Sequence, residues 1–264
     1  MSFTDLVDSH FHLLSMKNAG IDCAGVLSDL EAGNWGGGIA VCLSDEDCAY
    51  TLPLVRGRKN IFCALGCGPW DLDRADRPSP ESLVTDLERK LGTGDFAFIG
   101  EFGLDAYWQY GTPESQEKLM HLQLELSAAL NRPVIIHSRD AGTRTLEILL
   151  QHPGVRGIFH CYSYTADAAL KLAGRGWYIS FAGNITYKKS DAVRSALCAL
   201  PKECVLMETD SPYLAPVPHR GRPCDPRMVK DTYAASAALR GVDELSWRAT
   251  VLENFRRLTG EPCQ

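Results

Sequence analysis

Imidazole and carboxylate side chains follow several short apolar runs along this chain of 264 residues. His10 and His12 lie two positions apart, and alternate residues of an extended segment share a face, so the two rings would be able to bind one cation. Four of the seven histidines and two carboxylates stand at such run ends. The six residues are His10, His12, Glu101, His137, His160 and Asp210. Imidazole together with carboxylate is a ligand set for divalent metal ions, so the pattern predicts a metal site.

Six ligands exceed what one tetrahedral zinc ion can use. Two ions that share a bridging carboxylate would divide them, and Glu101, near the middle of the series, is the expected bridge. Asp210 would bind the first metal and also accept a proton from water that the metals activate. We therefore predict hydrolytic chemistry with Asp210 and Glu101 as the catalytic residues. For any one of the six, a strand-end polar group satisfied by ordinary hydrogen bonds is an equally good interpretation.

The elements expected to position these residues alternate between strands and helices. Continuous apolar runs that are too short for helices predict buried parallel strands. The first predicted strand ends at residues 6–7. The other seven span 39–43, 61–65, 97–99, 134–136, 158–159, 178–181 and 205–207. Helical patterns are predicted over 113–130, 140–150, 166–172, 191–200 and 228–239. In the first of these helices, the stripe of Leu119, Leu122, Leu126 and Leu130 is predicted to be the buried face.

Eight strand-then-helix units in a chain of this length predict an α/β fold, a single-domain TIM-like (β/α)8 barrel over residues 1–264. A doubly wound open sheet is the alternative. In barrel enzymes the active site lies at the C-terminal rim of the strands, which is where the six candidate ligands are expected. The glycines of 33–38 precede a predicted strand and indicate a turn, since no helix follows them to cradle a phosphate.

Composition narrows the functional classes. The formal net charge is -6, which argues against broad, non-specific coating of nucleic acid. No apolar stretch is long enough to span a membrane and no secretion signal opens the sequence, so we expect a cytoplasmic protein without membrane contact. The ten cysteines are scattered without zinc-finger spacing, and reduced, inert thiols are expected; Cys42, Cys63, Cys161 and Cys204 lie in or beside apolar runs.

Several longer motifs resemble those of the TatD family of metal-dependent deoxyribonucleases and related hydrolases, within the amidohydrolase-like barrels. The resemblance runs in order from residue 8 to Gly260. The motifs are Asp8-Ser9-His10-Phe11-His12-Leu13, Gly100-Glu101-Phe102-Gly103-Leu104-Asp105, Ile136-His137-Ser138-Arg139-Asp140-Ala141, Phe159-His160-Cys161-Tyr162-Ser163, Glu208-Thr209-Asp210-Ser211-Pro212-Tyr213-Leu214 and Arg220-Gly221-Arg222.

This resemblance implies two divalent ions, usually Mg²⁺ or Mn²⁺, and the mixed imidazole and carboxylate ligands also suit Zn²⁺. One would lie among His10, His12, Glu101 and Asp210, and the other among Glu101, His137 and His160. It also implies cleavage of phosphodiester bonds, often from the 3′ end of single-stranded DNA, with DNA or another phosphodiester bound transiently. Two metals suit this reaction because they stabilise both the attacking and the leaving oxygen of an in-line displacement.

The sequence departs from the family pattern at two places. Gly68 stands where the family commonly has histidine, in Gly66-Cys67-Gly68-Pro69, and the missing imidazole would remove a contact to substrate or phosphate. Cys224-Asp225-Pro226 replaces Asn-Glu-Pro. Asp225 would still orient its loop, whereas Cys224 loses the hydrogen bonds of the amide.

Three arginines are candidate phosphate contacts, because a guanidinium fork matches phosphate oxygens: Arg139, Arg220 and Arg222. For each, a surface salt bridge is the alternative. Aromatic residues near the rim could stack on a base, but core or loop packing is the expected role for most of them. They are Trp70, Tyr107, Trp108, Tyr162 and Tyr213.

Two other functions stay open at this point. One is hydrolysis of amide, ester or lactone bonds, including aminoacyl esters. Glu101 disfavours the phosphotriesterase-like and urease-like branch, whose members carry a carboxylated Lys at the fourth strand to bridge their metals. The other is a non-catalytic scaffold that keeps an inherited metal site.

Overall fold

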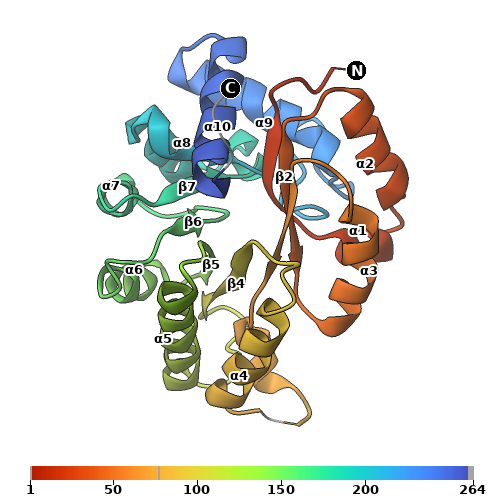
Figure 1. Cartoon of the computed structure of the whole chain (residues 1–264). Helices are drawn as coiled ribbons and strands as arrows, with labels where there is room; N and C mark the ends of the chain where they lie inside the picture. The colour runs from red at the N-terminus through yellow and green to blue at the C-terminus, as the bar shows by residue number, and fades with distance from the viewer. Residues whose placement is uncertain (1, 77, 261–264) are drawn as a thin grey trace.

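Eight parallel strands form one sheet, in which each strand pairs with the next along the chain (Figure 1). The computed structural model describes residues 2–76 and 78–260. The strands are β1 (Val7–Phe11), β2 (Gly37–Cys42), β3 (Ile61–Leu65), β4 (Phe98–Asp105), β5 (Val134–Arg139), β6 (Gly157–Phe159), β7 (Tyr178–Phe181) and β8 (Val205–Met207). The strands are almost wholly buried, as expected for a parallel sheet covered on its outside by helices.

Helices surround the strands on the outside of the molecule (Figure 1). The α-helices are α1 (Leu13–Asn18), α2 (Cys23–Ala32), α3 (Asp45–Val55), α4 (Pro80–Leu91), α5 (Pro113–Leu130), α6 (Gly142–Leu150), α7 (Ala166–Ala173), α8 (Asp191–Ala199), α9 (Val229–Arg240) and α10 (Glu244–Thr259). Short 3-10 helices are η1 (Pro69–Asp73), η2 (Gly183–Thr186), η3 (Lys202–Cys204) and η4 (Pro226–Met228). Among the described helices, none combines the length and the apolar character that a membrane span requires.

The ends of β1 and β8 meet and close the barrel. The backbone N–H of Asp210 donates to the carbonyl of His10 at 2.9 Å, and that of His12 donates to Ser211 at 2.9 Å. Inside the same seam, the Asp8 carboxylate accepts from the amide and the hydroxyl of Thr209, at 2.9 and 2.6 Å. This closure confirms the barrel and excludes the open sheet.

Three strands extend further than the apolar runs predicted. β1 was expected to end at Val7, yet it continues to Phe11, and β4 and β5 continue through Glu101 and His137. The polar residues of β1 are tolerated inside the barrel because other strands satisfy them: the Ser9 hydroxyl, for example, lies 2.7 Å from the Ser180 hydroxyl of β7 and donates to the Met207 carbonyl of β8 at 3.2 Å. Apolar character alone therefore underestimates strands that carry a site.

The predicted helices are confirmed within one or two residues, and capping explains their limits. α5 begins at Pro113 after Thr112, whose hydroxyl accepts from the Ser115 amide, and ends at Leu130, after which Asn131 adopts the left-handed conformation. Its predicted apolar stripe is wrong in part, since Leu130 is 38% exposed. The buried face instead includes Gln116 and Gln123, because their amide groups bond to loops of the barrel rim.

The glycines of 33–38 form the predicted turn and then enter β2. Gly33 follows the last residue of α2, and Gly37 has a φ of 129°. A Cβ at Gly37 would lie 2.2 Å from the carbonyl oxygen of Asn60, so β2 and the segment before β3 approach only because no side chain intervenes.

Tyr233 of α9 clamps the first strand from outside the barrel. Its hydroxyl accepts from the amide of Val7 and donates to the carbonyl of Val7, both at 3.2 Å. Tyr233→Phe is expected to lower the free energy of unfolding by about 1–3 kcal/mol, because buried polar groups of Val7 lose their partner. Urea denaturation measures this, with the exposed Tyr213→Phe as control. An unchanged midpoint for Tyr233→Phe would show that the clamp contributes nothing.

Candidate metal centre

The six predicted ligands converge at the C-terminal rim of the barrel. They come from β1 and its end, from β4, from β5 and from the segments directly after β6 and β8. Three groups of side chains place their ligand atoms within 4.8 Å of one another: His10, His12 and Glu101; Glu101, His137 and His160; His10, His160 and Asp210. All six residues predicted from the sequence thus belong to one cluster.

The first half of the cluster lies around the two histidines of β1. The Nε2 atoms of His10 and His12 are 3.0 Å apart. Oδ1 of Asp210 lies 3.8 Å from the first of these nitrogens and 3.5 Å from the second. Oε1 of Glu101 is 3.6 Å from Nε2 of His12. Two imidazole nitrogens and two carboxylates therefore face a common point.

The second half shares Glu101 and lies toward β5 and β6. Oε2 of Glu101 is 2.7 Å from Nε2 of His160 and 3.7 Å from Nδ1 of His137. Glu101 reaches this position because β4 lies unusually close to β5: a Cβ at Gly103 would meet the His137 carbonyl oxygen at 1.9 Å. Oε2 also lies 3.7 Å from Nε2 of His10, so the Glu101 carboxylate faces both halves of the cluster.

The buried polar atoms of this cluster fit a cation. Oε2 of Glu101 and Nε2 of His160 are buried and lie close together, yet neither has a partner with hydrogen-bond geometry. Leaving such groups unpaired costs free energy unless another ligand satisfies them. Imidazole and carboxylate suit Zn²⁺, Mn²⁺ or Fe²⁺, so the residues present fit a divalent metal.

Burial and mutual charge set the protonation of the cluster. Burial opposes ionisation of Glu101, but His160 and His10 outweigh it and hold the pKa of this carboxyl well below its ordinary value. Burial and neighbouring His160 lower the pKa of His10. Burial likewise opposes protonation of His160, yet Glu101 raises the pKa of that imidazole well above its ordinary value. A metal must displace this proton, so its affinity falls as the pH falls.

Two carboxylates that the sequence analysis did not assign support the histidines from outside. Oδ2 of Asp105 lies 3.2 Å from Nε2 of His137, which leaves Nδ1 facing Glu101. Glu208 accepts from the Cys161 amide at 2.6 Å and lies 3.5 Å from Nδ1 of His160. Such partners fix the ring orientation and the tautomer of a metal-binding histidine. Asp105 could have been found from the sequence: it lies four residues after Glu101 in the same strand, and alternate residues of a strand share a face.

Asp105→Asn is expected to weaken binding of one metal by about 10- to 100-fold, because the amide no longer accepts from His137. The fold should persist, since the remaining oxygen can still accept from the amides of Tyr107 and Trp108. Titration of metal-free protein with Mn²⁺ measures the affinity, and exposed Asp191→Asn is the control. Unaltered metal affinity would contradict the orienting role.

The three arginines predicted to contact phosphate are all exposed. Arg139 lies over the exposed ring of Tyr107 at 4.1 Å and near that of Trp108 at 5.6 Å. Arg220 lies over Tyr187 at 4.4 Å, and Arg222 is exposed. Within the described part of the chain, none of these three arginines forms an ion pair with a carboxylate. The salt-bridge alternative is therefore not realised.

Among the other aromatic candidates, Tyr162 packs in the core, which is the role expected for most of them, and offers no face to a base. It is fully buried, and its hydroxyl donates to the Thr165 carbonyl at 2.7 Å. Tyr213 is exposed, with its ring 6.3 Å from that of His12, and the ring of Trp70 lies 5.7 Å from that of His137. These two lie beside the metal cluster.

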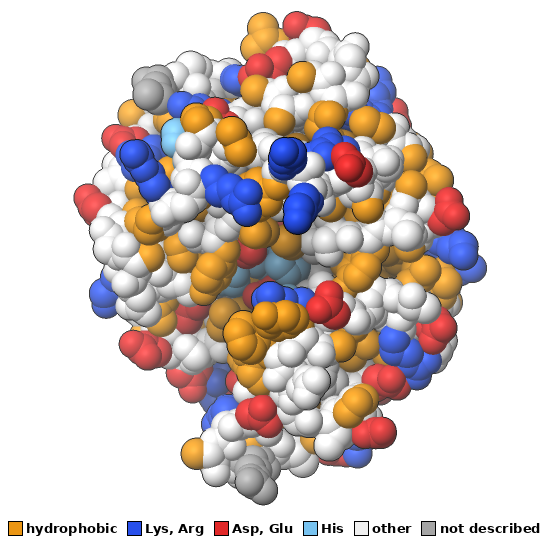
Figure 2. Space-filling view, turned by 180° about the vertical axis from the view of Figure 1, so that it is seen from behind, with side chains coloured by type: hydrophobic (Ala, Val, Ile, Leu, Met, Phe, Trp, Pro, Cys, Tyr) orange, Lys and Arg blue, Asp and Glu red, His pale blue; other side chains and the backbone are white. Residues whose placement is uncertain are grey.

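The cluster lies at the bottom of an open hollow. Figure 2 shows histidine side chains in the centre of this face, with Lys and Arg side chains on both sides and hydrophobic side chains next to them. Local positive charge is thus available near the metal ligands despite the net charge of -6.

The second departure from the family pattern is structurally mild. Cys224 is buried, and its amide donates to the Pro212 carbonyl at 2.9 Å. Asp225 begins η4 and accepts from the amide and the Nε of Arg227, at 2.9 and 3.0 Å, so it does orient its loop. The described cysteines are free thiols; Cys42, Cys63 and Cys204 are buried as expected, whereas Cys161 is only half-buried.

A parallel barrel with imidazole and carboxylate ligands at the C-terminal rim defines a metal-dependent hydrolase class, and comparison with known proteins agrees. A model of the TatD-related DNase family matches residues 7–260. The uncharacterized metal-dependent hydrolase YcfH of Escherichia coli K12 is 36% identical over 261 residues, covering 96% of this chain and 95% of that protein. YabD of Bacillus subtilis, also described as an uncharacterized metal-dependent hydrolase, is 33% identical over 255 residues, covering 96% and 98%.

Solved structures of TatD-family proteins also match this chain. The crystal structure of YjjV, a TatD homologue from Escherichia coli, matches with a TM-score of 0.85 at 25% identity, covering 98% of this chain and all of that one. A TatD-family hydrolase from Entamoeba histolytica matches in fold, with a TM-score of 0.81 at 17% identity, covering 99% and 100%. The chain belongs to the TatD family of metal-dependent hydrolases.

Proposed function

We propose that this protein is a two-metal phosphodiesterase, a deoxyribonuclease that acts from the 3′ end of DNA. The observation that supports it best is the pair of ligand groups that share Glu101, with His10 and His12 on one side and His137 and His160 on the other. One shared carboxylate allows two cations to lie close together, which is the arrangement suited to in-line displacement at phosphorus.

Two sets of residues that share Glu101 form the two proposed cation sites. His10, His12, Glu101 and Asp210 would hold one cation; Glu101, His137 and His160 would hold the other. When bound, the two cations lower the pKa of water and neutralise charge on the phosphoryl group. Asp210, whose side chain is 15% exposed, stands where it can accept the proton that the attacking water loses. Asp105 and Glu208 keep the two outer histidines oriented.

The phosphate is held by the exposed basic groups of the rim. Arg139, stacked on Tyr107, and Arg220, stacked on Tyr187, have guanidinium groups free of carboxylates, as does Arg222. An unpaired guanidinium near a dication site suits a phosphate oxygen. The exposed rings of Tyr107 and Trp108 offer faces on which a base of a single strand can stack.

A substrate panel tests the proposal. Purified protein, reconstituted separately with Mg²⁺, Mn²⁺ or Zn²⁺, is incubated with single-stranded DNA labelled at either end, with RNA, and with amide, lactone and aminoacyl esters. Release of mononucleotides from the 3′ end is the expected result. Turnover of the amide or ester substrates without cleavage of any phosphodiester would contradict the proposal.

A further inference from the structure

A cavity of about 600 Å³ lies beside the metal cluster, between the ends of β2 and β3. This size is ordinary for a site that holds a small molecule or part of one. Apolar side chains form much of its wall: Leu43, Leu65, Leu83 and Leu87. Because the cavity opens among segments that follow the strands, it belongs to the same rim of the barrel as the metal ligands.

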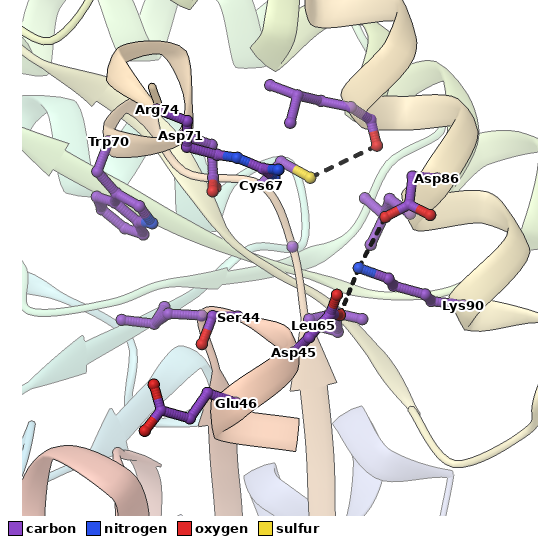
Figure 3. A pocket seen from close by; sticks show the side chains of 14 residues that line it. Ser44, Asp45, Glu46, Leu65, Cys67, Trp70, Asp71, Arg74, Asp86 and Lys90 are labelled. Atoms are coloured by element: carbon purple, nitrogen blue, oxygen red, sulfur yellow. Dashed lines mark hydrogen bonds and ion pairs between the residues drawn. The ribbon is translucent and has the colours of Figure 1, made fainter. Parts of the chain in front are cut away.

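Trp70 joins this cavity to the metal cluster. Its ring lines the cavity and lies 5.7 Å from the ring of the metal ligand His137. The nitrogen-bearing edge of the indole faces the inside of the cavity (Figure 3). Nε1 is buried and has no hydrogen-bond partner. A buried donor without a partner is costly, so a ligand with an acceptor atom would be stabilised there.

Gly68 is what permits this position of the indole. A Cβ at residue 68 would lie 2.1 Å from Cζ2 and 2.2 Å from Cε2 of Trp70. Any side chain at 68, including the histidine that the resemblance leads one to expect, would force the indole to move. The glycine and the tryptophan therefore form a matched pair that shapes this part of the rim.

The charges around the cavity disfavour a phosphate inside it. Four carboxylates, Asp45, Glu46, Asp71 and Asp86, outnumber the two cations, Arg74 and Lys90. Lys90 is already paired with Asp45 at 2.5 Å and with Asp86 at 2.7 Å (Figure 3). These pairs occupy Asp45 and Asp86, and Asp71 already accepts from the Gly68 amide at 2.9 Å. Among the described lining residues, Glu46 is the carboxylate left to accept from a planar group that carries amino donors.

We propose that this cavity binds a nucleobase with an exocyclic amino group, such as cytosine, belonging to the nucleotide whose phosphate lies at the metal cluster. The indole N–H of Trp70 donates to a ring nitrogen or carbonyl of the base, and a carboxylate such as Glu46 accepts from its amino group. Acidic side chains recognise the amino group of cytosine in this way elsewhere. The inference rests on the proposed phosphodiesterase function and adds a preference among bases to it.

Equilibrium binding tests the base site without any cleavage. Calorimetry on the Mn²⁺-loaded protein compares dCMP, dTMP and deoxyribose 5-phosphate, which share a phosphate and a sugar. We expect dCMP to bind about 10-fold more tightly than the compound without a base, and more tightly than dTMP, whose carbonyl replaces the amino donor.

The variant Trp70→Phe removes the N–H donor and keeps an aromatic ring. It should weaken dCMP binding by about 3- to 10-fold and leave deoxyribose 5-phosphate unaffected. Trp177→Phe, which alters a buried indole elsewhere in the barrel, is the matched control. Equal binding of dCMP and deoxyribose 5-phosphate to the wild type, or equal weakening of both by Trp70→Phe, would overturn the base site.

This readout separates the two proposals. If no phosphodiester is cleaved but dCMP is still preferred through Trp70, the nuclease proposal fails and the base site stands. If DNA is cleaved while the three ligands bind alike, the nuclease stands and the base site fails.

Discussion

Asp210→Asn is expected to reduce metal-dependent hydrolysis by about 10²- to 10⁴-fold, because the amide cannot accept a proton from the attacking water. The residue lies directly after β8, with its amide hydrogen-bonded to His10 and its carboxylate facing both histidines of β1. Its φ of 56° is one that asparagine adopts readily, so the loop should keep its shape. Steady-state cleavage of single-stranded DNA measures kcat.

Asp140→Asn is the matched control for this variant. Asp140 is exposed on the same rim and has a φ of 54°, so the substitution makes the same chemical change without touching the cluster. Its kcat should equal that of the wild type. A kcat of Asp210→Asn comparable to that of the wild type would show that Asp210 does not accept the proton.

Glu101→Gln should empty both halves of the metal cluster. The carboxylate faces all four histidines, at distances from 2.7 to 3.7 Å, and it is buried. Loss of a residue that only orients a ligand weakens metal binding by about 10- to 100-fold. Loss of the charge of Glu101, which faces the metal position itself, is expected to weaken metal binding by more than this. Metal content after gel filtration, measured by plasma mass spectrometry, gives the answer.

Glu114→Gln, at the exposed first turn of α5, is the control and should retain the wild-type metal content. Two tightly bound ions in Glu101→Gln would rule out the bridge. Retention of one ion would show that the halves of the cluster bind independently of the shared carboxylate.

The barrel could be predicted from sequence because its strands are short, apolar and regularly separated by helices. β3, β7 and β8 have the predicted limits. β1, β4 and β5 were predicted too short, because their last residues are polar and are tolerated only through partners on other strands of the barrel, such as Ser180 for Ser9. Those partners depend on the register of the closed barrel, which a linear pattern does not contain.

The residues of the site divide in the same way: some could be predicted from the linear sequence, and others depend on contacts that form only in the folded barrel. The cluster of six candidate ligands was predictable because each of these residues follows an apolar run and because four of the seven histidines stand at such positions. Asp105 and Glu208 were missed as supports, although both stand in the motifs, since their roles appear only when His137 and His160 are placed beside them. The significance of Gly68 was likewise hidden, because the indole that covers it comes from the 3-10 helix that begins one residue later.

Activity as a function of bound metal tests the central claim most directly. Metal-free protein is titrated with Mn²⁺ while cleavage of single-stranded DNA is followed, and bound metal is counted in the same samples. The two-metal account predicts negligible cleavage until more than one ion is bound per chain, and full activity at two. Full activity with a single bound ion, or no cleavage of any phosphodiester with two ions bound, would contradict it.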